Sequence, residues 1–166
     1  MTRDVSSDIS ANLLHDYSKG EYDLVMTIKE SGLPQPQLTD YITEPLVWVR
    51  GNNLILEPEA PLPLILYPKG CLYRKSIINA LTQANQPWRI VYSTSSLLGI
   101  HAAIKAGLGI SALSKSTVPE GLEASYNFAP CPTLGNLSIG FSYESNTITS
   151  ASRMLLDYLK HGLNAP

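Results

Sequence analysis

Hydrophobic residues recur along the chain at two spacings, and these predict alternating helices and strands. Near the start, Ile9, Leu13 and Tyr17 follow one another at four-residue intervals, after serine and aspartate residues suited to capping a helix, and Gly20 marks the end of that helix. The run over residues 22–28 is rich in β-forming residues and predicts a strand. Helix, glycine and strand together form an αβ unit.

The same alternation continues to the end of the chain. Turn residues fill 31–37, and prolines at 58, 61 and 63 predict a loop rather than a helix. Further helices are expected from Leu72 to a point before Pro87, over 96–106 and over 151–163, and further strands over 45–50, 64–67, 88–92, 108–113 and 137–143. The pattern predicts an α/β fold with largely parallel sheets, in which ligands bind beyond the carboxyl ends of the strands.

Residues 107–112, G-L-G-I-S-A, match the letters of the dinucleotide-binding pattern G-x-G-x-x-A. That site needs a strand before the first glycine and a helix after the last, so that phosphate meets free N–H groups. Here the predicted helix precedes Gly107, and the carbonyl groups at a helix C-terminus repel phosphate. We therefore interpret Gly107 as a left-handed residue that ends the helix and Gly109 as room for close helix–strand packing. No cofactor is expected.

The other end of this predicted helix, residues 93–96, carries four small hydroxyl residues between a strand and a helix N-terminus. Two other places resemble it, residues 5–8 before the first helix and residues 67–72 before the helix that follows the prolines. A single serine before a helix is more often simply an N-cap. The three junctions together favour a ligand pocket, because unpaired N–H groups accumulate where helices begin.

Net charge and hydropathy indicate which classes of function are not expected. The 12 Lys and Arg and 14 Asp and Glu residues give a net charge of −2, and the densest basic group is only Lys69, Arg74 and Lys75, so the chain is not expected to bind nucleic acid. No apolar run is long enough to span a bilayer, and the first residues, M-T-R-D-V-S-S-D, hold no signal-peptide core. These features predict a soluble, cytoplasmic protein without a membrane partner.

Metal and catalytic chemistry are not expected either. Cys71 and Cys131 form no C-x-x-C pattern, which favours two reduced, half-buried thiols; a regulatory disulfide is the alternative and needs Cα atoms within about 7 Å. His15, His101 and His161 each lack a second ligand at helical spacing and are interpreted as packing or surface residues. No Ser-His-Asp or Cys-His spacing, paired acid motif or phosphate-binding loop occurs, so we predict that the chain is not an enzyme.

Four segments carry a resemblance to a known family. They are residues 7–26 with G-E-Y-D-L, residues 41–52 with E-P-L-V-W-V, residues 98–113 with A-G-L-G-I, and residues 137–163. In order and content they resemble the effector-binding domain of LysR-type transcriptional regulators, whose fold is similar to that of type 2 periplasmic binding proteins. The resemblance extends over nearly the whole chain.

This resemblance implies two lobes joined by two crossover strands, with residues 1–47 and 134–166 in the first lobe and residues 48–133 in the second. It also implies a homo-oligomer and a small-molecule effector held between the lobes. Serine hydroxyls and helix N-termini suit a carboxylate or another small anion, with Lys69 or Arg74 as helpers, although such residues are more often plain surface charges. The implied ligand-binding residues lie in the same three junctions: Ser6, Ser7, Tyr67, Pro68, Gly70, Cys71, Leu72, Ser93, Thr94, Ser95 and Ser96.

The chain departs from the family pattern in two ways. The helix-turn-helix that normally precedes this domain has no counterpart here, so DNA binding is expected only through a domain absent from this chain. The first lobe is expected to be incomplete, because its first strand, first helix and most of its second strand are unmatched; either the chain is a fragment or a neighbouring chain covers the open edge. The alternative function is a free-standing solute-binding protein of the same fold, against which the missing signal peptide counts.

Overall fold

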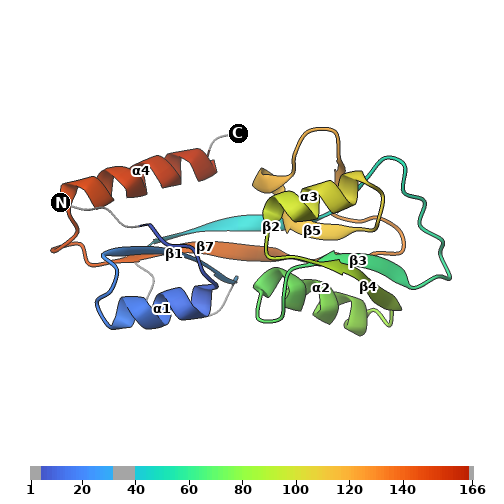
Figure 1. The fold of residues 1–166 in the computed structure, drawn as a ribbon, viewed down its shortest axis with the longest axis horizontal. Helices are drawn as coiled ribbons and strands as arrows, with labels where there is room; N and C mark the ends of the chain where they lie inside the picture. Colours follow the sequence, from blue (N-terminus) through green and yellow to red (C-terminus); the bar gives the residue numbers. More distant parts are fainter. Residues whose placement is uncertain (1–4, 32–39, 165–166) are drawn as a thin grey trace. The chain divides into compact units, whose positions relative to one another are not determined.

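The helices and strands occur in the order that the hydrophobic pattern predicts, with one additional short strand at Glu123–Ser125 (Figure 1). They do not alternate throughout, because the three strands between residues 24 and 66 follow one another with no helix described between them. The computed structural model describes residues 5–31 and 40–164, so the predicted turn at 31–37 lies, beyond Ser31, outside the described residues. The helices are α1 (Ser10–Ser18), α2 (Leu72–Gln83), α3 (Leu97–Lys105) and α4 (Ser150–Asn164), with a 3-10 turn at Lys115–Thr117. The strands are β1 (Leu24–Glu30), β2 (Asp40–Arg50), β3 (Leu62–Leu66), β4 (Trp88–Ser93), β5 (Ser111–Ser114), β6 (Glu123–Ser125) and β7 (Asn136–Tyr143).

The chain divides into two compact units. The first comprises Met1–Thr43 and Leu137–Pro166, and the second comprises Glu44–Asn136. The chain leaves the first unit within β2 and returns to it at the start of β7. In the part of the chain that the structure describes, none of the helices has the length and apolar character needed to cross a lipid bilayer.

The expectation of largely parallel sheets is wrong. One sheet has the strand order β1-β7-β2-β5 with β6 also paired to β2, and β1–β7, β2–β5 and β2–β6 are all antiparallel. β3 and β4 form a separate two-stranded parallel sheet. Parallel neighbours need a crossover connection, usually a helix. α2 supplies this crossover connection between β3 and β4. β2 and β5 are far apart in the sequence and are not joined by a single crossover helix, so nothing requires them to be parallel.

In the first unit, one core cluster joins Ile139 and Phe141 of β7 to Leu156 of α4. α1 packs on β1, and the Ser10 hydroxyl accepts a hydrogen bond from the Ile28 N–H at 3.0 Å. The preceding serine and aspartate residues were expected to cap α1, but the N-cap residue is Ile9 and it makes no side-chain cap hydrogen bond. The acceptor before it is the Asp8 carboxylate, which bonds the Ile9 N–H at 2.6 Å and the Asn12 amide at 2.9 Å.

In the second unit, β3 is buried on both faces, as its uninterrupted apolar sequence predicts. Leu64 and Leu66 pack with Trp48 and α2, whereas Ile65 packs with α3 in a second cluster. The Trp48 indole N–H is satisfied by the Pro132 carbonyl at 2.6 Å. Pro63 is tolerated inside β3 because the backbone group used there is its carbonyl, which accepts from the Ile110 N–H at 2.8 Å.

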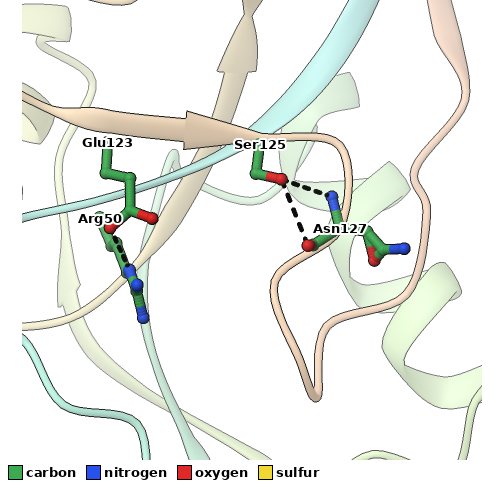
Figure 2. Close-up of polar contacts among 4 residues, drawn as sticks. All are labelled: Arg50, Glu123, Ser125 and Asn127. Atoms are coloured by element: carbon green, nitrogen blue, oxygen red, sulfur yellow. Dashed lines mark hydrogen bonds and ion pairs between the residues drawn. The ribbon is translucent and has the colours of Figure 1, made fainter.

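β6, which the hydrophobic pattern did not predict, is attached to β2 by side chains as well as by backbone pairing (Figure 2). Arg50 lies opposite Glu123 in the register, and the Arg50 Nε–Glu123 Oε2 distance is 2.8 Å. The guanidinium also lies 4.5 Å from the centre of the Phe128 ring. After the strand, the Ser125 hydroxyl accepts from the Asn127 N–H and donates to the Asn127 carbonyl, both at 3.2 Å, which fixes the turn.

The two glycines of the G-x-G-x-x-A segment have structural roles. Gly107 has φ +74° and follows the end of α3. Its N–H bonds the Ile104 carbonyl at 2.9 Å and the Leu108 N–H bonds the Ala103 carbonyl at 3.1 Å, which is a Schellman C-cap and confirms the helix-ending interpretation. The interpretation of Gly109 needs correction, since its close neighbours are the Pro63 carbonyl of β3 and the Val91 side chain of β4, which are strands and not a helix.

Candidate functional site

Two of the three predicted junctions adjoin in the second unit. β3 and β4 are parallel, with Leu66 opposite Ser93 in the register. The Thr94 N–H donates to the Leu66 carbonyl at 3.1 Å, just beyond the last residue of β4. Residues 67–72 and 93–96 therefore follow neighbouring strands at the same carboxyl edge, where open α/β sheets bind ligands.

The junction over residues 67–72 is a tight turn into α2. Gly70 has φ +94°, a conformation that favours glycine, and the Cys71 N–H bonds the Pro68 carbonyl at 3.3 Å. Pro68 and Lys69 are exposed, and within residues 5–31 and 40–164 the Lys69 ammonium has no hydrogen-bond or ion-pair partner. α2 begins after Cys71 without a side-chain cap. Of its first N–H groups, those of Tyr73 and Arg74 approach the Cys71 thiol, which is a weak acceptor. The positive end of the helix dipole favours an anion at this position.

Two tyrosines and a serine support this turn. The Tyr67 and Tyr73 rings have centroids 5.6 Å apart, and the Tyr73 hydroxyl is hydrogen-bonded to the Ser114 hydroxyl of β5 at 2.8 Å. Arg74 donates from Nη1 to the Tyr67 carbonyl at 3.0 Å, so part of this predicted helper is used in positioning the turn. The sequence analysis missed Tyr73 and Ser114, because an aromatic residue at a helix start and a serine in a strand resemble ordinary packing residues.

Burial raises the pKa values of the two tyrosines and the cysteine of this turn. Burial raises the pKa of Tyr67 to about 12. Burial also raises the pKa of Tyr73; the hydrogen bond with Ser114 opposes this increase, and Cys71 and the Glu44 carboxylate add to it. The Cys71 pKa is raised by burial too, although the N–H groups of Arg74 and Tyr73 act in the opposite direction. A thiol with a raised pKa is a poor nucleophile and a poor metal ligand, so Cys71 contributes surface and shape to the site.

The serines in residues 93–96 differ in role: one is a helix N-cap, and others are left without a structural role. Ser96 is the N-cap of α3, and its hydroxyl accepts from the Gly99 N–H at 3.3 Å. The Thr94 hydroxyl accepts from the Ser96 N–H at 3.2 Å. Ser93 and Ser95 are exposed, and among the described residues their hydroxyls have no intramolecular partner. The N-cap explanation therefore accounts for Ser96 and leaves Ser93 and Ser95 available to a ligand.

The third junction lies in the first unit. Ser6 and Ser7 are exposed and precede α1. Their participation in a site with the other two junctions stays a prediction.

The remaining candidate residues are the possible metal ligands, the histidines and the cysteines. No group of three or more His, Cys, Asp and Glu side chains suited to a metal ion occurs among the described residues. His15 and His161 are exposed, and His101 is half-buried with no hydrogen-bond partner for its Nε2 among the described residues. Both cysteines are free thiols, and burial raises the pKa of Cys131 to about 12. The site thus combines hydroxyl and N–H donors with one lysine, an arrangement suited to holding an anion.

Comparisons with known proteins agree on one family. The family described as LysR substrate binding domain matches residues 2–164. The chain is 32% identical over 111 residues to the HTH-type transcriptional regulator PecT of Dickeya dadantii (strain 3937), covering 66% of this chain and 34% of PecT. It is 30% identical over 128 residues to the HTH-type transcriptional regulator DgdR of Burkholderia cepacia, covering 74% of this chain and 42% of DgdR. It thus spans well under half the length of these two relatives.

Solved structures share the fold. The regulatory domain of HypT from Salmonella typhimurium, in its apo form, superposes with a TM-score of 0.73 at 16% identity, over 96% of this chain and 81% of that chain. The regulatory domain of CcmR from Synechocystis PCC6803, in complex with 2-PG, superposes with a TM-score of 0.62 at 20% identity, over 95% and 82%. These similarities confirm the predicted α/β fold of periplasmic-binding-protein type.

Proposed function

The chain belongs to the LysR substrate-binding domain family, and from this membership we propose that it senses a small anionic metabolite for a transcriptional regulator. The ligand binds at the paired junctions of the second unit, residues 67–72 and 93–96. The domain acts by binding and not by catalysis, because the groups at these junctions are hydrogen-bond donors without a nucleophile and base in contact.

One observation carries this proposal. Parallel β3 and β4 end at the same edge, so the turn into α2 and residues 93–96 follow neighbouring strands there, and the hydroxyls of Ser93 and Ser95 have no intramolecular partner among the described residues. Helix N-termini attract anions through their unpaired N–H groups and the helix dipole. Residues 67–72 and 93–96 contain no aspartate or glutamate and add one free cation, Lys69. A small carboxylate is the ligand that this combination fits best.

The proposed mechanism is a shift of population. A ligand that binds one conformation of the domain more tightly than another raises the share of that conformation by its differential affinity. The chain spans 34% of PecT and 42% of DgdR, and we propose that DNA recognition comes from a separate helix-turn-helix part of such a regulator. A cytoplasmic homo-oligomer is the proposed working state.

The test is calorimetric titration of the 166-residue chain with a panel of small carboxylates and amino acids. For a compound that binds, Ser95→Ala removes one hydrogen bond and is expected to weaken affinity about three- to tenfold. Lys69→Gln removes a charge-assisted contact and is expected to weaken affinity about tenfold or more. The matched controls are Ser116→Ala and Lys105→Gln, which change an exposed serine and an exposed lysine of the same unit outside the two junctions.

Controls that retain full affinity while both junction variants lose it support the assignment. Junction variants that bind as tightly as the unchanged chain would place the ligand elsewhere and reject it.

A further inference from the structure

The second unit also has a groove at the amino-terminal end of β3 and β4, opposite to the end where the two junctions lie. Its volume is about 360 Å³, and it is lined by Leu54, Ile55, Leu56, Glu57, Ala60, Pro61, Leu62, Pro63, Arg89, Gly107 and Leu108. The loop between β2 and β3, the first residues of β3, Arg89 of β4 and the turn after α3 contribute to the lining. None of these residues belongs to the junctions at residues 67–72 and 93–96, so this groove is a separate place on the molecule.

The surface that lines the groove is about equally polar and apolar, and its apolar part is partly in contact with water. Leu54 and Leu56 pack partly against the core beneath, whereas Ile55 is 86% exposed and Leu108 is 53% exposed. The volume lies within the range of about 300–1,000 Å³ that is typical of small-molecule sites. Covering these two aliphatic side chains would remove apolar surface from water and so favour binding of an apolar body.

Arg89 provides a positive charge in the groove. It lies opposite Pro63 in the β3–β4 register and lines the groove. In the described ranges its guanidinium has no hydrogen-bond or ion-pair partner. A free guanidinium beside apolar surface is complementary to a carboxylate, which it binds through two parallel N–H donors. Glu57, the acidic residue of the lining, disfavours a ligand with a second negative charge.

From these observations we propose that the groove binds an apolar monocarboxylate, a small molecule with one carboxylate and an aromatic or branched aliphatic body. The carboxylate lies at Arg89, and the body lies between the 54–56 segment and Leu108. The site goes beyond the proposed effector site, and neither depends on the other.

The test uses the ¹⁵N-labelled 166-residue chain with phenylacetate as the probe and phenylacetamide as its uncharged counterpart. Phenylacetate is expected to shift the amide signals of residues 54–57, 59, 60, 89, 107 and 108 in a saturable manner. Arg89→Gln is expected to weaken phenylacetate about tenfold, as loss of a charge-assisted contact predicts, and to leave phenylacetamide unchanged. Leu108→Ser is expected to weaken both probes, because both use the same apolar surface.

Arg153→Gln is the matched control, since it removes an exposed arginine from α4 in the first unit. It should leave both titrations unchanged. Three results overturn the proposal: no saturable shift at these amides, equal affinity of phenylacetate for the Arg89→Gln variant, or groove shifts that grow with protein concentration before any probe is added. The last result would assign the groove to a second copy of the chain. Variants at Ser95 and Lys69 address the other site and do not enter this test.

Discussion

Gly109 lies where the segment that enters β5 passes closest to β3. A Cβ at this position would lie 2.3 Å from the Pro63 carbonyl oxygen and 3.1 Å from Val91 Cγ2. The nearer atom is backbone that bonds the Ile110 N–H, so it cannot move without breaking that pairing. We predict that Gly109→Ala lowers the free energy of unfolding of the second unit by about 1–3 kcal/mol, the usual cost of overpacking.

Urea denaturation followed by tryptophan fluorescence measures this cost, because both tryptophans of the chain, Trp48 and Trp88, lie in the second unit. The same substitution at Gly162 is the control, since nothing lies within 4 Å of a Cβ there. On a helix, Gly162→Ala should stabilise the first unit by about 0.5–1 kcal/mol, seen by circular dichroism. A Gly109→Ala variant as stable as the unchanged chain would contradict the argument.

Gly107 and Gly109 show which properties of a single residue can be predicted from the sequence. Gly107 was predictable because a helical pattern that stops at a glycine leaves few alternatives to a left-handed cap. Gly109 was correctly expected to allow close approach, but its partner was wrong. The neighbour of Gly109 is Pro63, 46 positions earlier in the chain, and local spacing carries no information about such a distant contact.

At the scale of elements, two neighbouring serines at the start of α3 have different roles. Ser96 caps the helix through the Gly99 N–H, whereas Ser95 has no intramolecular bond within the described part of the chain. We predict that Ser96→Ala lowers the free energy of unfolding by about 1 kcal/mol, the typical value of an N-cap. Ser95→Ala should change it by less than about 0.5 kcal/mol, as for an exposed residue without contacts.

The same fluorescence-monitored urea titration gives both values. Comparable losses for the two variants, or a larger loss for Ser95→Ala, would show that the cap is assigned to the wrong residue. Because Ser95→Ala leaves the fold intact, it is also the cleaner probe of ligand binding.

Helices and strands with strong periodicity were predictable, and their partners were not. The apolar run of β3 indicated a doubly buried strand, and the repeat in α4 indicated an amphipathic helix. β6 escaped prediction because it has three residues and is attached by Arg50, Glu123 and backbone pairing rather than by an apolar pattern. The same limit applies to the site: the junctions were visible as polar residues before helices, but the Tyr73–Ser114 bond joins α2 to β5 and has no local signal.

At the scale of the whole molecule, the hydrophobic clusters follow the division into two units. Phe141, Ile139 and Leu156 form a cluster with partly buried neighbours that all belong to the first unit. The clusters around Trp48 and Ile65 draw their members from the second unit alone. Because apolar burial dominates folding stability, a core substitution in one unit should act mainly on that unit.

We therefore predict that Phe141→Ala, at a side chain with 0% exposure, destabilises the first unit by about 3–5 kcal/mol, the usual cost of removing a buried ring. The tryptophan fluorescence transition should keep its midpoint, because Trp48 and Trp88 report on the second unit. Circular dichroism, to which α1 and α4 also contribute, should gain an earlier transition. Ile77→Ala, in the core of the second unit, is the control and should move the fluorescence midpoint. If Phe141→Ala moves that midpoint as far as Ile77→Ala does, the units unfold as one cooperative body, and stability cannot be assigned unit by unit.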